Sequence, residues 1–132
     1  MELQFLLDTH IVIRWLTEPR KLNREQTRVL EDAERRGAPL AVSAISLLEI
    51  AGLFAKDRLS GSMAAIFEKL DREPLFVLLP ITVEIAAAVA TLGGTLTDPA
   101  DRAIVATARV HRLRLVTSDQ RIVASKLVPV VE

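Results

Sequence analysis

Short, mostly apolar runs recur along this chain, and longer stretches with helical patterning separate them. Runs of this kind are typical of strands that are buried on both faces, as in a parallel sheet. The pattern predicts five strands, the last of them at the edge of the sheet: residues 3–7, 38–43, 75–79, 114–117 and 128–131.

Helix start and stop signals lie between these runs. Asn23, with Gln26 three residues later, begins a helix that Gly37 ends. Asp98-Pro99-Ala100-Asp101 puts an acidic N-cap before a proline at the first helical position, and predicts a helix to about His111. Further helices are predicted from Ser46 toward Lys56, from Ser62 to Leu70, from Thr82 to Leu92, and near residues 122–125.

Strands and helices alternate from end to end, without a linker, a repeat or a low-complexity segment. This alternation predicts an α/β fold, in which a mainly parallel central sheet is flanked by helices. We expect one domain over residues 1–132, a length that suits a single domain of ordinary size.

Composition narrows the classes of function. The 132 residues include 17 basic and 17 acidic side chains, and this balance excludes a strongly basic protein that coats nucleic acid. The chain has no cysteine, which excludes thiolate metal sites, disulfides and a cysteine nucleophile, and with only His10 and His111 we expect no metal site built from several histidines. It has neither a signal peptide pattern nor an apolar stretch long enough to span a membrane, so we expect a cytoplasmic protein with no membrane partner.

Five acidic residues stand where the predicted elements begin or end. Asp8 follows the first strand, Asp119 follows the strand at 114–117, and Glu49, Asp98 and Asp101 lie in first helical turns. Sites in open α/β sheets form beyond the carboxyl ends of the strands, so these residues are expected to meet there. A cluster of carboxylates repels itself unless a cation or protons relieve it, and oxygen ligands alone suit Mg²⁺ or Mn²⁺.

Each acidic residue also has a local explanation. Glu49 completes the capping-box pattern with Ser46, and Asp98 and Asp101 complement the dipole of the helix that follows them. Asp8 suits a turn, and Asp119 suits a helix cap.

The charge balance favours a phosphodiester substrate. With those five carboxylates set apart in one pocket, the rest of the chain has five more basic than acidic residues. A hard cation at the scissile phosphate and positive charge along the backbone suit such a substrate. The candidate contacts to the nucleic acid backbone are Arg14, Lys56, Arg58, Arg102, Arg112 and Arg121.

Four segments, in this order, resemble the PIN domain family, and most of all the VapC-type toxins of bacterial toxin–antitoxin pairs. They are residues 6–10 (LLDTH), 46–50 (SLLEI), 98–108 (DPADRAIVATA) and 115–119 (LVTSD). The resemblance implies a Mg²⁺- or Mn²⁺-dependent endoribonuclease. It also implies an RNA substrate, a cognate antitoxin and a homodimer.

The resemblance assigns the metal-binding and catalytic acids to Asp8, Glu49, Asp101 and Asp119. Thr117 would be the hydroxyl that supports the site, and Asp98 matches an additional acid of one subgroup. The acids would hold one or two ions that activate a water, so no side-chain nucleophile is needed. His10 is expected to point away from the site or to pack locally rather than to act as a general base.

Two alternatives remain open. One is a PIN scaffold that is catalytically silent and serves only for binding. The other is a receiver-like phosphoacceptor signalling module, which is also α/β and similar in length. Such a module needs an acidic pair at the first strand and a late lysine near a proline. Lys126 and Pro129 are present, but Asp8 has no acidic neighbour.

Overall fold

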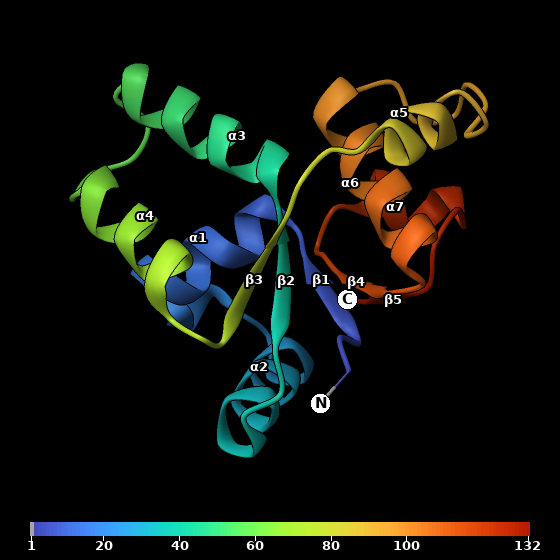
Figure 1. The fold of residues 1–132 in the computed structure, drawn as a ribbon. Coiled ribbons are helices and arrows are strands. Elements are labelled where there is room, and N and C mark those ends of the chain that lie inside the picture. The colour runs from blue at the N-terminus through green and yellow to red at the C-terminus, as the bar shows by residue number, and fades with distance from the viewer. Residues whose placement is uncertain (1) are drawn as a thin grey trace.

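A parallel sheet of five strands runs through the centre of the protein (Figure 1), in a computed structural model that describes residues 2–132. Its strands are β1 (Phe5–Leu7), β2 (Leu40–Ser43), β3 (Phe76–Leu79), β4 (Arg114–Val116) and β5 (Val130–Val131). Their order in the sheet is β3-β2-β1-β4-β5, and every neighbouring pair is parallel. The predicted α/β class is therefore confirmed, and so is the place of the last strand at an edge.

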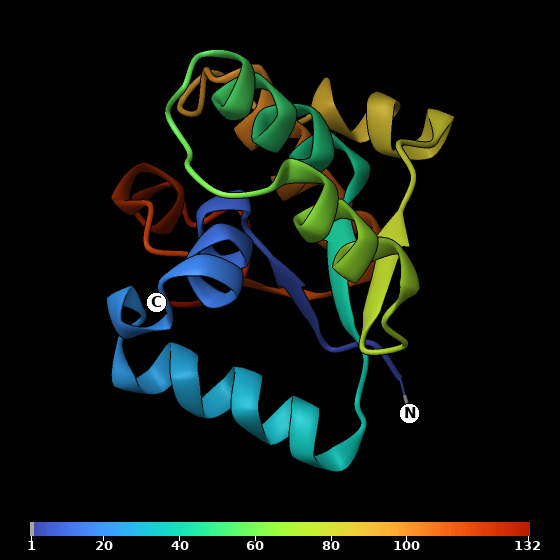
Figure 2. The ribbon, with the colours of Figure 1, turned by 90° about the vertical axis from the view of Figure 1, so that its left-hand side faces the viewer.

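Seven α-helices flank the sheet within the described residues. They are α1 (Thr9–Thr17), α2 (Arg24–Arg36), α3 (Ala44–Ala55), α4 (Met63–Arg72), α5 (Val83–Val89), α6 (Pro99–His111) and α7 (Gln120–Ser125), with a short 3-10 helix, η1, at Pro19–Lys21. Figures 1 and 2 show α1, α2 and α4 on one side of the sheet and α6 and α7 on the other. The two sides correspond to two separate hydrophobic cores.

Neighbouring residues of one strand divide between these cores. Leu7 packs with α1, α2 and α4, whereas Leu6 packs with α5, α6 and α7, because successive side chains of a strand point to opposite faces. Both leucines are fully buried. Burial on both faces explains why the strands are apolar throughout instead of alternating with polar residues.

The local signals at two helix starts act as predicted. Asn23 and Gln26 form a reciprocal capping box, and Gly37 ends α2 in the left-handed conformation with φ 66°. Asp98 caps α6 through a 3.0 Å hydrogen bond from the Asp101 N–H, with Pro99 in the first turn. Both predictions rest on contacts within one turn, which the sequence alone determines.

Other helix boundaries differ from the predicted ones. The helix expected to open at Ser46 begins instead at Ala44, with Ser43 as its N-cap, so Ser46 and Glu49 form no capping box. The helix predicted to continue to Leu92 ends at Val89. The helix α1, which starts directly after β1 with Asp8 as its cap, was not predicted as a helix.

Arg102 has a structural role rather than the proposed contact with nucleic acid. Its guanidinium donates hydrogen bonds to the carbonyl oxygens of Val89, Gly93 and Leu96, at 2.8, 2.7 and 2.6 Å. These carbonyls belong to the end of α5 and to the loop that leads to α6. The side chain therefore closes this loop, and the backbone contact suggested for Arg102 is wrong.

The sheet has a topological switch point between β1 and β4. The chain leaves β1 toward β2 and β3 on one side, and later returns to add β4 and β5 on the other. Helices on opposite faces diverge at such a point and leave a crevice beyond the carboxyl ends of the two strands. Asp8 and Thr117 are the residues that directly follow β1 and β4.

No helix among residues 2–132 has both the length and the apolar content that a membrane span requires.

We expect Arg102→Met to lower the free energy of unfolding by about 2 kcal/mol, because three carbonyls lose a charged donor while the aliphatic stem is kept. Urea denaturation measures this change. Arg102→Lys should recover part of the loss. Arg20→Met is the control, because the Arg20 side chain is 86% exposed. Equal stability of the Arg102→Met and Arg20→Met variants would contradict the structural role.

Candidate active site

Asp8 occupies the switch point because of the strand register. Leu7 pairs with Val116, so the next residues, Asp8 and Thr117, lie side by side. The Asp8 N–H donates to the Val116 carbonyl at 3.0 Å. One Asp8 carboxylate oxygen accepts from the Thr9 N–H at 2.8 Å and caps α1, which holds the buried side chain at the end of the strand.

Thr117 joins two of the candidate acids. Its hydroxyl donates to Asp8 Oδ2 at 2.8 Å and accepts from the Asp119 N–H at 3.0 Å. The residue is fully buried, so its hydroxyl reaches these partners without competition from water. This is the geometry expected of a hydroxyl that supports the site.

Glu49 comes from the helix that follows β2. Because α3 begins at Ala44, Glu49 lies beyond the first turn and makes no cap contact. Its Oε1 instead accepts a hydrogen bond from the Thr9 hydroxyl, and that hydroxyl also lies 2.7 Å from Ser46 Oγ. The local capping explanation for Glu49 is therefore wrong, and the carboxylate is held beside Asp8 by a residue 40 positions away.

The start of α6 supplies Asp101, and the start of α7 supplies Asp119. The Asp101 side chain is 12% exposed and that of Asp119 is 18% exposed. Asp119 also caps α7 by accepting from the Arg121 N–H at 2.9 Å. Its capping role and its place beside the other acids are compatible, because one carboxylate has lone pairs for both.

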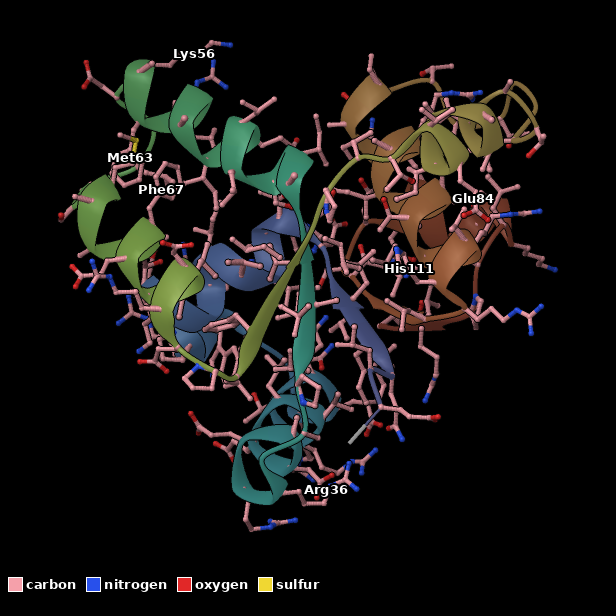
Figure 3. The ribbon with its side chains drawn as sticks, in the orientation of Figure 1. Arg36, Lys56, Met63, Phe67, Glu84 and His111 are labelled. Atoms are coloured by element: carbon pink, nitrogen blue, oxygen red, sulfur yellow. The ribbon has the colours of Figure 1, made fainter. Side chains whose placement is uncertain are left out.

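The four acids Asp8, Glu49, Asp101 and Asp119 line one pocket of about 390 Å³. Thr117 lies beneath this pocket rather than on its wall, and Asp98 is exposed and is not part of the lining. Lys56 and Arg58 line the same pocket, and Figure 3 shows Lys56 at the end of α3. The structure thus brings together four of the five acids that the sequence indicated.

Burial and mutual repulsion disfavour the charged forms of two of these acids. Burial, together with the charges of Asp98, Asp8 and Asp119, raises the pKa of Asp101 from 3.8 to about 7. Burial also raises the pKa of Glu49, although the Thr9 hydroxyl opposes this. The pocket therefore holds negative charge that the surrounding protein leaves only partly compensated.

Asp119 shows the opposite shift. The hydrogen bond from the Arg121 side chain lowers the pKa of Asp119. The guanidinium of Arg121 contacts both Asp119 and Asp101, so this residue is engaged by the acids themselves. Sequence reasoning placed Arg121 among contacts to nucleic acid and gave no sign of this pairing.

His10 lines the pocket, so the first of its two expected placements, pointing away from the site, is wrong, whereas the contacts of its ring agree with the second, in which it packs against its neighbours. Its Nε2 accepts a 2.8 Å hydrogen bond from the Ser118 N–H, and its Nδ1 lies 3.5 Å from Asp8 Oδ2. Burial lowers the pKa of His10. Since Nε2 is already occupied by a donor, this imidazole links the loop after β4 to Asp8 and does not offer a free base to the pocket.

Sequence reasoning missed a buried connection beneath the loop after β4. The Gln26 side-chain amide donates to Ser118 Oγ at 2.7 Å, and Gln26 is 1% exposed. Its capping-box pattern identified Gln26 as a helix cap, and that role is confirmed. The second contact spans 92 residues, and no local pattern could have indicated it.

The donors suit a hard divalent cation, because they are carboxylate oxygens whose negative charge is only partly compensated. Within residues 2–132, however, no three acidic or histidine side chains are close enough together to form a ready set of metal ligands. A cation would have to draw the carboxylates inward or bind some of them through water. The residues of the pocket therefore fit a divalent cation by the chemistry and charge of their oxygen atoms, and not by a ready arrangement of ligands.

The pKa of Asp101 predicts a specific dependence of stability on pH. Unfolded Asp101 releases its proton near pH 3.8, whereas the folded protein keeps it up to about pH 7. Its contribution to the free energy of unfolding therefore falls as pH rises between these values. Asp101→Asn should be more stable than the original chain by about 1–3 kcal/mol at pH 8, and the difference should vanish near pH 4.

Urea denaturation in EDTA at the two pH values measures this difference. Asp119→Asn is the matched variant with the opposite sign, because the lowered pKa of Asp119 means that its charged form stabilises the fold. An Asp101→Asn variant that gains no stability at pH 8 would contradict the repulsion described for this pocket.

Comparisons with known proteins agree with these features. A family model described as PIN domain matches residues 5–126. The chain is 35% identical over 118 residues to Ribonuclease VapC22 of Mycobacterium tuberculosis, covering 89% of this chain and 88% of that protein.

Two solved structures are also similar over nearly the whole chain. FitAcB from Neisseria gonorrhoeae has a TM-score of 0.71 at 25% identity, with 98% of this chain and 97% of that one covered. A toxin–antitoxin complex from Klebsiella pneumoniae has a TM-score of 0.66 at 25% identity and the same coverage. The resemblance inferred from the four sequence motifs is confirmed, and the chain belongs to the PIN domain family.

Proposed function

We propose that this protein is a Mg²⁺- or Mn²⁺-dependent endoribonuclease and the toxin of a toxin–antitoxin pair, with residues 1–132 forming one PIN domain. The observation that carries the proposal is the meeting of Asp8, Glu49, Asp101 and Asp119 in one pocket at the switch point of the sheet. The similar protein from Mycobacterium tuberculosis is named a ribonuclease, which supports the same activity here.

In this proposal the four acids hold the divalent cation, directly or through water. The bound cation supplies a more acidic water and offsets the negative charge of the scissile phosphate. The two Asp8 oxygens accept from the Thr9 N–H and the Thr117 hydroxyl, and Oδ1, which His10 does not face, keeps a second lone pair for a ligand. Thr117 is therefore a positioning residue, because it fixes the rotation of the Asp8 carboxylate.

The remaining residues around the pocket contribute charge. Asp98 acts by its negative charge, which raises the pKa values of Asp101 and Glu49, and in addition caps α6. Lys56 and Arg58, on the wall of the same pocket, are the basic residues best placed to contact phosphates on either side of the cleaved bond. An RNA substrate also implies that the protein works in the cytoplasm.

The proposed partners are RNA, a cognate antitoxin and a second copy of the chain. The similar structure from Klebsiella pneumoniae is described as a toxin–antitoxin complex, which supports the antitoxin. Large apolar side chains that remain exposed, such as Leu48 at 69% and Val83 at 87%, support an interface with another protein chain.

Sedimentation of the purified chain tests the homodimer, and a mass equal to one chain would contradict it.

We expect Asp8→Asn and Asp101→Asn each to lower RNA cleavage by at least about a hundred-fold, since each removes a proposed cation ligand and changes the side-chain volume little. The assay uses structured total RNA and the purified chain without a partner. It is run in Mg²⁺, in Mn²⁺ and in EDTA, and circular dichroism checks that the variants fold.

Asp32→Asn is the matched control for this assay. Asp32 lies on α2, pairs with Arg35 and Arg36, and is remote from the pocket. Figure 3 labels Arg36 at the end of the molecule opposite to Lys56. Full activity of the Asp8→Asn or Asp101→Asn variant, or cleavage that persists in EDTA, would contradict the proposal. A folded chain that neither binds the cation at Asp101 nor cuts RNA would favour the catalytically silent scaffold, whereas cation binding without cleavage would indicate a narrow RNA substrate that is absent from the pool.

A further inference from the structure

Arg121 bridges two of the four acids from the first turn of α7. Its Nη2 lies 2.9 Å from Asp119 Oδ2 and 3.4 Å from Asp101 Oδ2, and its Nε donates to Asp119 Oδ1 at 3.2 Å. Among residues 2–132, no other lysine or arginine forms an ion pair with Asp8, Glu49, Asp101 or Asp119. Arg121 is thus the positive side chain that directly offsets the charge of the pocket.

The Arg121 side chain is able to leave this position. It is 70% exposed, in contrast to the largely buried carboxylates that it contacts. Ion pairs made by exposed side chains are weak, because water screens the charges and ordering a long side chain costs entropy. Arg102, by comparison, is fixed by three backbone carbonyls, so the two arginines have different uses although both lie near the start of α6 or α7.

We propose that Arg121 is a built-in counter-ion that competes with the divalent cation for Asp101 and Asp119. This inference rests on the proposed function, in which those two acids are cation ligands. A guanidinium keeps its positive charge at all ordinary pH values, and it would lie against a divalent cation held by the same two carboxylates. Filling of the site therefore requires the Arg121 side chain to move out toward solvent.

This competition sets the cation concentration at which the site fills. In the free protein Arg121 relieves part of the repulsion between Asp101 and Asp119, because it lowers the pKa of Asp119 and opposes the rise in the pKa of Asp101. When the Arg121 side chain moves out, it no longer offsets the repulsion between Asp101 and Asp119. The cation then has to offset this repulsion. The measured affinity for the cation is therefore lower than it would be without Arg121, because binding breaks the ion pairs of Arg121 with Asp101 and Asp119.

The test is a titration of the purified chain with Mn²⁺ in the absence of RNA, followed by the electron paramagnetic resonance signal of free Mn²⁺. We expect Arg121→Gln to bind Mn²⁺ about three- to ten-fold more tightly than the original chain, the range that corresponds to two exposed ion pairs. The Mg²⁺ concentration for half-maximal RNA cleavage should fall by a similar factor.

Lys56→Gln is the matched control for charge. Lys56 lines the same pocket but forms no ion pair within residues 2–132, so its removal changes the general field without freeing a ligand. We expect its Mn²⁺ affinity to change by less than about two-fold, because salt screens exposed charges that are not in contact. An equal gain in the Lys56→Gln and Arg121→Gln variants would overturn the proposal and indicate a general field effect.

The remaining outcomes separate this inference from the proposed function. If Asp101→Asn abolishes Mn²⁺ binding but Arg121→Gln leaves it unchanged or weakens it, the competition is overturned while the cation site stands. If Mn²⁺ affinity is unchanged but the KM for RNA rises in Arg121→Gln, Arg121 is a substrate contact and the competition is likewise overturned. If no variant shows binding that depends on Asp101, both the competition and the cation site are overturned.

Discussion

The parallel pairing of β1 with β4 is the constraint on which the candidate site depends. It puts Asp8 beside Thr117, and the Thr117 hydroxyl then holds Asp8 and the backbone of Asp119 at once. The same pairing creates the switch point, where helices diverge to opposite faces and leave a crevice. Without this pairing of strands, nothing would hold Asp8 close to Asp119.

Repulsion among carboxylates is the second feature of the site, and the fold sustains it. Specific hydrogen bonds hold three of the acids in place: Asp8 caps α1, Asp119 caps α7, and Glu49 accepts from Thr9. The packing of the helices and the two hydrophobic cores offsets the unfavourable free energy of this repulsion. Burial and repulsion raise the pKa of Asp101 to about 7, so the pocket favours a proton, and in the proposed function a divalent cation, at this position.

Residues of one type serve unlike purposes here, and their surroundings decide which. Arg102 closes a loop through backbone carbonyls, Arg121 bridges two carboxylates, and Arg58 lines the pocket. The helix caps differ in the same way, since Asp98 is exposed whereas Asp8 is buried among the groups of the site. Both sets show that a side chain acquires a role through its contacts rather than through its chemistry alone.

The sequence by itself determined the α/β class, the strands and the helix starts at Asn23 and Asp98, because these depend on local pattern and on contacts within one turn. It also located Asp8 and Asp119 after strands and Asp101 in a first helical turn, whereas its placement of Glu49 in a first turn is wrong. Only the tertiary structure decided that β1 lies between β2 and β4, that Thr9 rather than Ser46 engages Glu49, and that Arg121 pairs with Asp101. Those contacts join residues that are 20 or more positions apart. Local sequence patterns do not indicate which residues so far apart in the chain come into contact.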